Sequence, residues 1–336
     1  MKSTSALYKT IFADPAHTVE HKVTIAGVTY GMDKLISIST PGQIFDGGPG
    51  IGMAISRELE LQFIPEGTIP TSAAVAVSTR LLLGTDASEW LKMGTFYIDS
   101  RTYDETGDIL SLHCYDAMLK TEYVYLDKHE DQDKASAWPQ SVRAIYDTIA
   151  YDIGITPNLT LMQSIPYNWY IPYPGNNTAR TMMCQIGAAL GGNWIITDNG
   201  ALDCKTLTKS ASVSQDLAMN VGTLSRGVDS AAFTRVKLTG ITGVEDVTEY
   251  VAGNTSGLTV EAECPWATQS ITNSVLSVIN GWVYRPYTAD EALLDPAVEI
   301  GDTVKINGWT SLVANLNRNF DNDIVNISLH FFLKDV

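Results

Sequence analysis

The sequence has few cysteines and no long hydrophobic run. Four cysteines stand singly among 336 residues, at Cys114, Cys184, Cys204 and Cys264, and no two form a C-x-x-C pair. This spacing argues against a zinc site and a disulfide framework, so we expect buried free thiols. No apolar stretch approaches the roughly 20 residues that span a bilayer, and the N-terminus lacks the apolar core of a secretory signal. We therefore expect no membrane-spanning segment and synthesis in a cytoplasm.

Basic residues are also scarce. The chain holds 22 Lys+Arg against 38 Asp+Glu, which gives a net charge of -16 and a pI of about 4.6. Binding to a phosphate backbone depends on clustered Lys and Arg, so this balance argues against a nucleic-acid-binding protein. With 45% hydrophobic residues the chain is not a disordered acidic tail. Its length fits two or three folded domains of about 100–200 residues each.

The acidic charge is concentrated towards the two ends of the chain. Residues 1–130 hold 10 basic and 17 acidic groups (-7), residues 131–208 hold 4 and 6 (-2), and residues 209–336 hold 8 and 15 (-7). We predict three domains with these boundaries: a β module at 1–130, an α+β domain at 131–208, and a second β module at 209–336. The predicted fold class is mainly β, two barrel or sandwich modules with a smaller α+β insertion.

Alternating and β-branched residues predict strands in both flanks. These runs lie at 21–25, 57–63, 95–99, 109–115, 235–238, 303–306 and 324–329. Turn-forming residues separate them at Ala26-Gly27, 105–108, Gly253-Asn254 and Asn307-Gly308. One helix is predicted in the second flank, near 267–280.

In the middle of the chain, apolar residues recur at the spacing of a helix and not of a strand. Apolar residues recur every three to four positions over 139–153, with Gly154 as a plausible C-cap. A second helix is predicted from the N-cap Thr178 to Leu190, where a pair of glycines ends it. A hairpin over 194–204 then follows, with its turn at 197–200.

One string matches a catalytic motif letter for letter. His17, Glu20 and His21 form H-x-x-E-H, which in inverzincin metallopeptidases presents two zinc ligands and a base on a helix. Here the string leads into an alternating strand pattern, which argues against that helix. We expect two solvent-facing histidines that bind no metal.

Other candidate sites lack the spacing that their chemistry needs. The glycines at 47–52 fit neither phosphate-loop pattern, so we expect a flexible loop. Two acidic clusters depart from the spacing of calcium loops, so we expect a solvated linker and a hairpin tip. They are Asp127, Glu130, Asp131 and Asp133, and Asp321-Asn322-Asp323. No G-x-S-x-G elbow is present. We propose no catalytic, cofactor-binding or metal-binding residue from the sequence and expect no cofactor.

An aromatic segment, 167–174, contains Trp169 and Tyr170 between prolines. Such a segment can stack on a sugar or seal a domain or subunit interface, and its composition favours the interface.

Several segments together resemble the hub proteins at the tip of bacteriophage tails. This family includes contractile-phage baseplate hubs and the N-terminal hub region of tail-associated lysins. The matching segments are 51–61 (IGMAISRELEL), 89–98 (EWLKMGTFYI), 110–119 (LSLHCYDAML), 178–181 (TART), 186–192 (IGAALGG), 198–202 (DNGAL), 284–286 (YRP) and 294–304 (LDPAVEIGDTV). Their order and spacing cover nearly the whole chain.

The resemblance implies a homotrimer whose chains each carry two modules related to the tail tube. Three chains would present six modules and adapt a six-fold tail to a three-fold tip. The implied partners are distal tail or tail tube proteins, tip or fibre proteins, a tape measure protein, and genomic DNA that passes without specific binding during ejection. The implied location is the tail tip or baseplate of a virion, assembled in the host cytoplasm.

The resemblance also offers a reason for the net negative charge of the chain. Carboxylates that face a channel repel DNA phosphates. The sequence leaves open which of Glu58, Glu60, Glu66, Asp99, Asp108, Glu299 and Asp302 face the channel. We expect Glu299, Gly301 and Asp302 to shape a turn before a strand instead.

Many lysin-type hubs continue into an enzymatic extension that this sequence does not show, so we expect a structural protein and not an enzyme. Two alternatives stay open. One is a tail-tip cell-wall-degrading enzyme, either a metallopeptidase using His17, Glu20 and His21 or a muralytic middle domain. The other is a carbohydrate-binding tip module centred on Trp169 and Tyr170. A tail-derived injection particle without DNA is a variant of the hub hypothesis.

Overall fold

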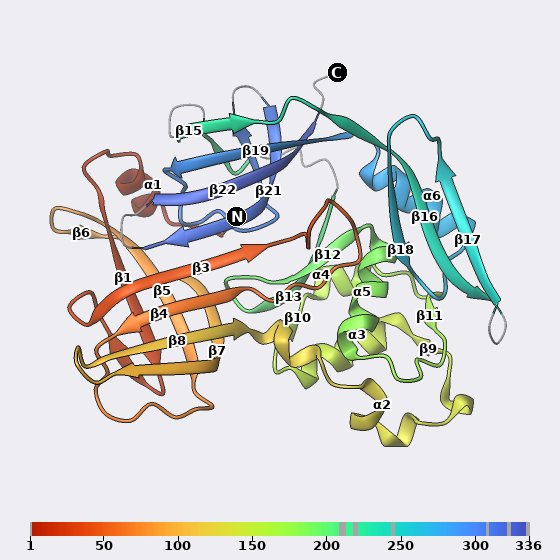
Figure 1. The fold of residues 1–336 in the computed structure, drawn as a ribbon, viewed down its shortest axis with the longest axis horizontal. Coiled ribbons are helices and arrows are strands. Elements are labelled where there is room, and N and C mark those ends of the chain that lie inside the picture. Colours follow the sequence, from red (N-terminus) through yellow and green to blue (C-terminus); the bar gives the residue numbers. More distant parts are fainter. Residues whose placement is uncertain are drawn as a thin grey trace.

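The computed structural model describes residues 2–207, 213–217, 221–242, 246–306, 309–320 and 324–333. Within these ranges the chain is mainly β with a smaller α+β part, as predicted (Figure 1). The predicted turn at Asn307-Gly308 and the acidic cluster at 321–323 lie outside them. The domain boundaries at 130 and 208 stay predictions.

The first β-rich part is a rolled sheet with one short helix, α1 (Ala6–Phe12). Its strands are β1 (Thr18–Ile25), β2 (Val28–Tyr30), β3 (Leu35–Gln43), β4 (Glu58–Phe63), β5 (Ala74–Leu83), β6 (Asp86–Ala87), β7 (Leu91–Asp104) and β8 (Ile109–Asp116). They pair in the order β2-β1-β5-β7-β8-β4-β3. Their inward side chains, among them Tyr30, Phe63 and Phe96, form one hydrophobic core.

The turn between β1 and β2 is the hairpin turn that the sequence predicts. Both of its central residues have positive φ, 49° at Ala26 and 85° at Gly27. Such turns match the right-handed twist of the strands they join. Helix α1, in contrast, was not predicted. It is capped by Ser5, whose side chain accepts a hydrogen bond from the Tyr8 N–H, and it buries Tyr8 and Ile11.

The middle part contains the two long helices and the hairpin that the sequence predicts. Its elements are α2 (Tyr125–Lys128), β9 (Gln140–Ser141), α3 (Val142–Asp152), β10 (Thr156–Pro157), α4 (Leu159–Ser164), β11 (Tyr170–Ile171), α5 (Ala179–Leu190), β12 (Gly192–Ile196) and β13 (Ala201–Thr206). Thr178 caps α5, and Gly191 ends it in the left-handed conformation, φ 73°. Tyr146 of α3 stacks on Trp194 of β12 inside a second core.

The second β-rich part includes a sheet that projects to the right in Figure 1, with α6 packed on it. Its elements are β14 (Gln215–Asp216), β15 (Val221–Arg226), β16 (Ala231–Thr242), β17 (Asp246–Gly253), β18 (Leu258–Glu263), α6 (Gln269–Ile279), β19 (Trp282–Ala292), β20 (Thr303–Ile306), β21 (Trp309–Asn319) and β22 (Ile324–Leu333). Helix α6 confirms the helix predicted near 267–280. The third core lies here and contains Phe233, Val275 and Trp282.

One sheet runs through both β-rich parts. Strand β21 of the second part pairs with β3 of the first over Asn315–Asn319, so the order β15-β19-β22-β21 continues into β3-β4-β8-β7. We call this eight-stranded surface the front sheet. In Figure 1 it extends from β15 near the top of the view to β8 and β7 near the bottom. None of the helices in the described ranges has the length and apolar character needed to cross a membrane.

Candidate functional site: a buried ion cluster and a polar sheet face

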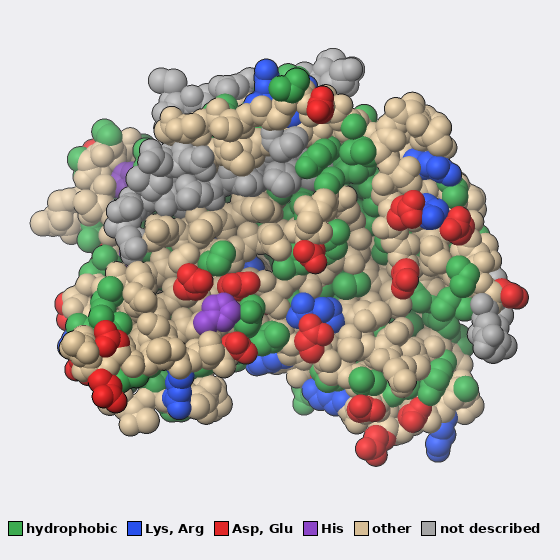
Figure 2. All heavy atoms as spheres, in the orientation of Figure 1, with side chains coloured by type: hydrophobic (Ala, Val, Ile, Leu, Met, Phe, Trp, Pro, Cys, Tyr) green, Lys and Arg blue, Asp and Glu red, His purple; other side chains and the backbone are tan. Residues whose placement is uncertain are grey.

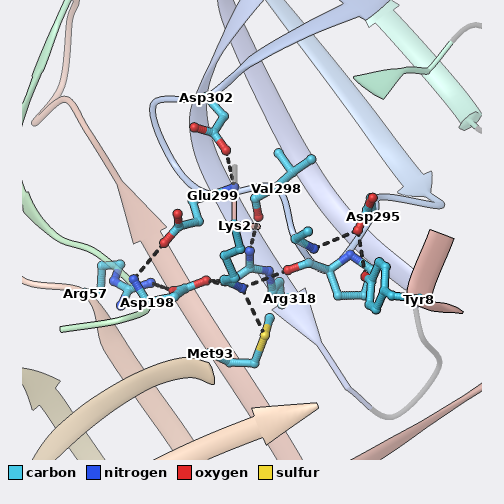
Figure 3. Close-up of polar contacts among 12 residues, drawn as sticks. Lys2, Tyr8, Arg57, Met93, Asp198, Asp295, Val298, Glu299, Asp302 and Arg318 are labelled. Carbon is cyan, nitrogen blue, oxygen red and sulfur yellow. Dashed lines mark hydrogen bonds and ion pairs between the residues drawn. The ribbon is translucent and has the colours of Figure 1, made fainter. Parts of the chain in front are cut away.

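A buried carboxylate holds three cations at the centre of the chain. Asp198, in the turn between β12 and β13, has a fully buried side chain. One of its oxygens lies 2.7 Å from Lys2 Nζ and 3.1 Å from Arg318 Nη1, and the other pairs with Arg57 (Figure 3). The Asp198 backbone N–H donates to Glu299 Oε1 at 2.8 Å. A turn residue is therefore fixed as firmly as a core residue.

The cations around Asp198 come from distant parts of the sequence. Arg57 directly precedes β4, Arg318 lies on β21, and Lys2 precedes α1. Lys2 also donates to the Pro296 carbonyl at 2.8 Å. Arg57 is also 3.5 Å from Asp116 at the end of β8. This ion cluster of Lys2, Arg57, Asp116, Asp198 and Arg318 therefore ties both β-rich parts to the hairpin of the middle part.

The environment shifts the pKa values of the cluster in different directions. Burial alone would raise the pKa of Asp198, but Lys2, Arg318 and Arg57 together hold it well below its usual value. Burial lowers the pKa of Lys2. Burial raises the pKa of Asp116 to about 6, because Arg57 compensates for it only in part. Asp198 therefore stays ionised, and because the pairs are buried, solvent screens its attraction to the cations only weakly.

Replacing Asp116 by Asn is expected to change how stability depends on pH. In the unfolded chain an Asp has a pKa of about 3.9, and in the folded chain that of Asp116 is about 6. The folded state therefore binds this proton more tightly, and the contribution of Asp116 to stability falls as pH rises between these values. The free energy of unfolding of wild type minus that of Asp116→Asn should decrease from pH 4 to pH 6 and then level off. Urea titrations across this range would measure it, and a constant difference would contradict the assignment.

The outward face of the front sheet is polar and holds no Lys or Arg on β3, β4, β8 or the end of β21. In this stretch the outward residues other than isoleucine are Ser37, Ser39, Pro41, Gln43, Glu58, Glu60, Gln62, Ser111, His113, Tyr115, Asn315, Asn317 and Asn319. Two isoleucines interrupt this polar character: Ile36 of β3 is 44% exposed, and Ile109 at the start of β8 is half-buried. Figure 2 shows acidic side chains and a histidine gathered over β4 and β8 on the face towards the viewer. We call this surface the polar face.

His113 has acidic neighbours on the polar face. Its Nε2 lies 3.2 Å from Glu58 Oε2, and its Nδ1 lies 3.9 Å from Asp99 Oδ2. Because the two carboxylates contact opposite ring nitrogens, the three groups do not converge on one point. Glu299 and Asp302, which were also candidates for a channel surface, are buried. The Glu299 N–H donates to Asp302 Oδ2 at 2.9 Å, and Gly301 has φ 79°, so these residues form the turn that was predicted.

The H-x-x-E-H residues do not form a metal site. Glu20 and His21 are neighbours on β1, so their side chains point to opposite faces of the sheet. Glu20 pairs with Arg80 at 2.6 Å, whereas His21 is buried, lies 2.7 Å from Thr79 Oγ1 and packs edge-on against Phe320. The prediction of two solvent-facing histidines is therefore wrong for His21. The alternation that buries Val23 and Ile25 also turns His21 inward.

The two histidines do line one cavity, between the two β-rich parts. It has a volume of about 560 Å³, and its other lining residues include Met93, Leu294 and Arg318. His17 contacts the Asp14 carbonyl through Nδ1 at 2.6 Å. In the part of the chain that the structure describes, no group of three or more His, Cys, Asp or Glu residues is placed to hold a metal ion.

The glycine-rich loop packs against the middle part. The Gly52 N–H donates to the Gly192 carbonyl at 2.9 Å, and the Asn193 side chain accepts from the Met53 N–H and donates to the Gly50 carbonyl. Gly52 has φ 74°, and a Cβ there would lie 2.9 Å from the Cys184 carbonyl oxygen. The loop joins two parts of the chain and precedes no helix that could bind phosphate.

The acidic residues at 127–133 lie in short helical turns at the surface. Asp127, Glu130, Asp131 and Asp133 are exposed, and Asp133 accepts a hydrogen bond from Tyr173 at 2.5 Å. The four cysteines are free thiols. Cys114, Cys204 and Cys264 are buried and Cys184 is half-buried, in keeping with the sequence prediction.

The aromatic segment divides between core and surface. Trp169 is half-buried and packs against two of the three hydrophobic cores, whereas Tyr167 is 79% exposed and stacks on the Arg143 guanidinium. Tyr170 is 48% exposed and Tyr173 43%. Trp169 thus seals an internal junction, as expected for an interface residue, and only the tyrosines are well placed to meet a partner.

Replacing Trp169 by Ala is expected to lower the free energy of unfolding by about 2–3 kcal/mol, less than a fully buried Trp because the ring is half-buried. Replacing Tyr167 by Ala is the matched control and should change it by less than about 0.5 kcal/mol. Urea unfolding followed by fluorescence measures both. Equal, small effects would show that Trp169 does not join the cores.

Comparisons with known proteins give a fold and no sequence match. No family model and no curated protein sequence matches the chain. Among solved structures, the 43 kDa tail protein of prophage MuSo2 from Shewanella oneidensis aligns with a TM-score of 0.59 at 13% identity, over 94% of this chain and 98% of that one. The tail protein from Neisseria meningitidis MC58 aligns with a TM-score of 0.58 at 10% identity, over 94% of this chain and 96% of that one. The chain therefore has the fold of these phage tail proteins, and the resemblance to phage tail proteins seen in the sequence is confirmed at the level of the fold.

Proposed function

We propose that this protein is a structural hub at the tip or baseplate of a phage tail. In this proposal three copies form a ring that adapts the six-fold tail tube or distal tail ring to a three-fold tip. The observation that carries it is the front sheet, which runs without a break through both β-rich parts. Two β-rich parts in each of three chains give six, the number that a six-fold neighbour requires.

The polar face supports a channel function for this ring. Its outward residues on β3, β4, β8 and the end of β21 are mostly amides, hydroxyls and carboxylates, with one histidine, one tyrosine, one proline and the two isoleucines at 36 and 109. DNA in contact with such a surface would meet no Lys or Arg and would be repelled by Glu58 and Glu60. We propose that this face lines the DNA exit channel and lets the polymer slide during ejection.

The remaining surfaces would serve assembly. The exposed tyrosines at 167, 170 and 173 lie on the middle part, and Tyr is enriched where proteins meet. Distal tail proteins, tip or fibre proteins and the tape measure protein are the partner classes that this position implies. We propose no enzymatic role, since the one catalytic motif in the sequence places its side chains on opposite faces of a strand.

Imaging of particles tests the proposal. Particles purified from cells that carry the gene would be examined by electron microscopy with an antibody against this chain. We expect label at one end of each tail, and tails that fail to assemble when the gene is deleted. Label elsewhere, or normal tails without the protein, would overturn the proposed function. A peptidoglycan-degradation assay on the purified chain should show no activity.

A further inference from the structure

The cavity between the two β-rich parts has mainly apolar walls and is open to solvent. Phe12 comes from the first part, and Leu294 and Phe320 come from the second. Its volume of about 560 Å³ lies within the range of sites that hold a small organic molecule, roughly 300–1,000 Å³. The exposed residues Ala13 and Leu293 also belong to its lining, so a ligand has a way in.

The lining of this cavity is not acidic, although the chain as a whole is. The chain has a net charge of -16, yet no Asp or Glu stands among the lining residues, all of which lie in the described ranges. The titratable side chains of the lining are Arg318, His17 and His21. Lys2 lies directly behind it, since its Nζ is 3.3 Å from Sδ of the lining residue Met93 (Figure 3). The cavity is therefore suited to an anion and not to a cation.

The nearest carboxylates are already occupied. Lys2 and Arg318 share a single oxygen of Asp198, at 2.7 and 3.1 Å. Asp295 lies between two lining residues in the sequence, but one of its oxygens accepts from the Tyr8 hydroxyl at 2.7 Å and from the Ala297 N–H at 2.8 Å. On this side of the ion cluster, two cations thus depend on one carboxylate oxygen.

One buried donor of the lining has no acceptor. Arg318 is only 4% exposed; its Nη1 pairs with Asp198 and its Nη2 donates to the Val298 carbonyl. Its Nε has no hydrogen-bond partner. A buried N–H without an acceptor is unfavourable and uncommon in native proteins. An oxygen atom bound in the cavity beside Arg318 would satisfy it.

We propose that this cavity binds a medium-chain fatty acid, with its carboxylate against Arg318 and its alkyl chain along the apolar walls. The polar requirement is confined to one anionic group, because the guanidinium offers one unmatched donor and most of the lining is apolar. Hydrogen bonds between a guanidinium and a carboxylate are strong, and burial of the alkyl chain adds to them. The ligand would contact both β-rich parts and stabilise their junction, whether or not the protein is a tail hub.

Three ligands with the same alkyl chain and different head groups test this proposal. At pH 7 octanoate is an anion, octanol is neutral and octylammonium is a cation. Titration calorimetry on the purified chain should show one octanoate per chain, bound about tenfold more tightly than octanol and with no measurable octylammonium binding. Octanoate should also raise the melting temperature. Octanol or octylammonium binding as tight as that of octanoate, or no octanoate binding at its highest usable concentration, would overturn the proposal.

Substitutions locate the bound ligand. Ala13→Trp adds a large side chain to the lining and should weaken both octanoate and octanol at least several-fold. Ala16→Trp is the matched control, because Ala16 is equally exposed but is not part of the lining, and it should leave both affinities unchanged. An equal effect of the two substitutions, or none from either, would place any binding outside this cavity.

Arg318→Lys tests the head group. It keeps a cation for Asp198 and removes the Nε donor, so octanoate affinity should fall about tenfold, to that of octanol, while octanol affinity stays the same. Unchanged octanoate affinity would contradict the role given to Arg318. Circular dichroism establishes whether the variant is folded; if it is not, the Ala13→Trp and Ala16→Trp pair together with the three ligands decides the question.

Discussion

Replacing Asp198 by Ala is expected to lower the free energy of unfolding by about 3–5 kcal/mol. The substitution removes one carboxylate and leaves Lys2, Arg57 and Arg318 buried together without it. Breaking a buried ion pair from one side costs more than the pair itself contributes, since the remaining charge has lost both water and partner. Here three cations would also repel one another. We expect the two β-rich parts and the hairpin to lose their fixed arrangement first.

Asn199→Ala is the matched control for this prediction. Asn199 is the next residue of the same turn and is exposed, so its replacement should change stability by less than about 0.5 kcal/mol. Urea unfolding followed by tryptophan fluorescence would compare the variants, and limited proteolysis would show whether the parts separate. If Asp198→Ala unfolds with the same midpoint and slope as Asn199→Ala, the cluster does not hold the parts together.

Local elements could be predicted from the sequence because their signals are local. The cap at Thr178, the apolar spacing over 179–190 and Gly191 together specify α5, and the structure shows each of them in its role. The hairpin turn at Ala26-Gly27 is similar, since the turn type follows from the residues within it. Where neighbours in the sequence determine the conformation, prediction succeeded.

The burial of two polar residues, Arg318 and His21, could have been predicted from the alternation of their strands. Arg318 follows Ala314 and Leu316 at alternate, inward positions of β21, and His21 precedes Val23 and Ile25 in the same way on β1. A polar residue in the inward phase of an alternating strand is predicted to be buried and to need a partner. The alternation of β1 therefore predicts a buried His21, in place of the exposed His21 that we expected.

Asp198 and the β3–β21 joint carried no such signal. An Asp in a D-N-G turn is ordinary turn chemistry, and nothing in the neighbouring residues indicates that three cations surround it. Likewise Asn315–Asn319 and Ser39–Gln43 are far apart in the sequence, and strand pairing at that separation depends on the whole fold. The surface on which the proposed function depends is thus a product of tertiary structure.

Replacing both Glu58 and Glu60 by Lys is expected to give the polar face, the proposed channel surface, an affinity for DNA that the wild-type carboxylates oppose. A trimer would gain six lysines on the polar face. Non-specific DNA affinity in the range of about 10⁻⁴–10⁻⁶ M should appear where wild type shows none, and its dependence on salt should have a slope of about -5. Fluorescence anisotropy of a duplex fragment between about 50 and 200 mM salt, the range over which such contacts lose affinity, would measure both.

The control for this change is Glu130→Lys with Asp131→Lys. It alters the net charge by the same amount at two exposed positions of the middle part, away from the front sheet. If the polar face lines the channel, particles that carry Glu58→Lys and Glu60→Lys should assemble normally and release DNA slowly, with recovery at high salt because counterions compete for the phosphates. Particles with the control substitutions should release DNA like wild type. Equal release from both would place the channel at another surface, while defective assembly of the Glu58→Lys, Glu60→Lys variant alone would make the polar face a contact between proteins.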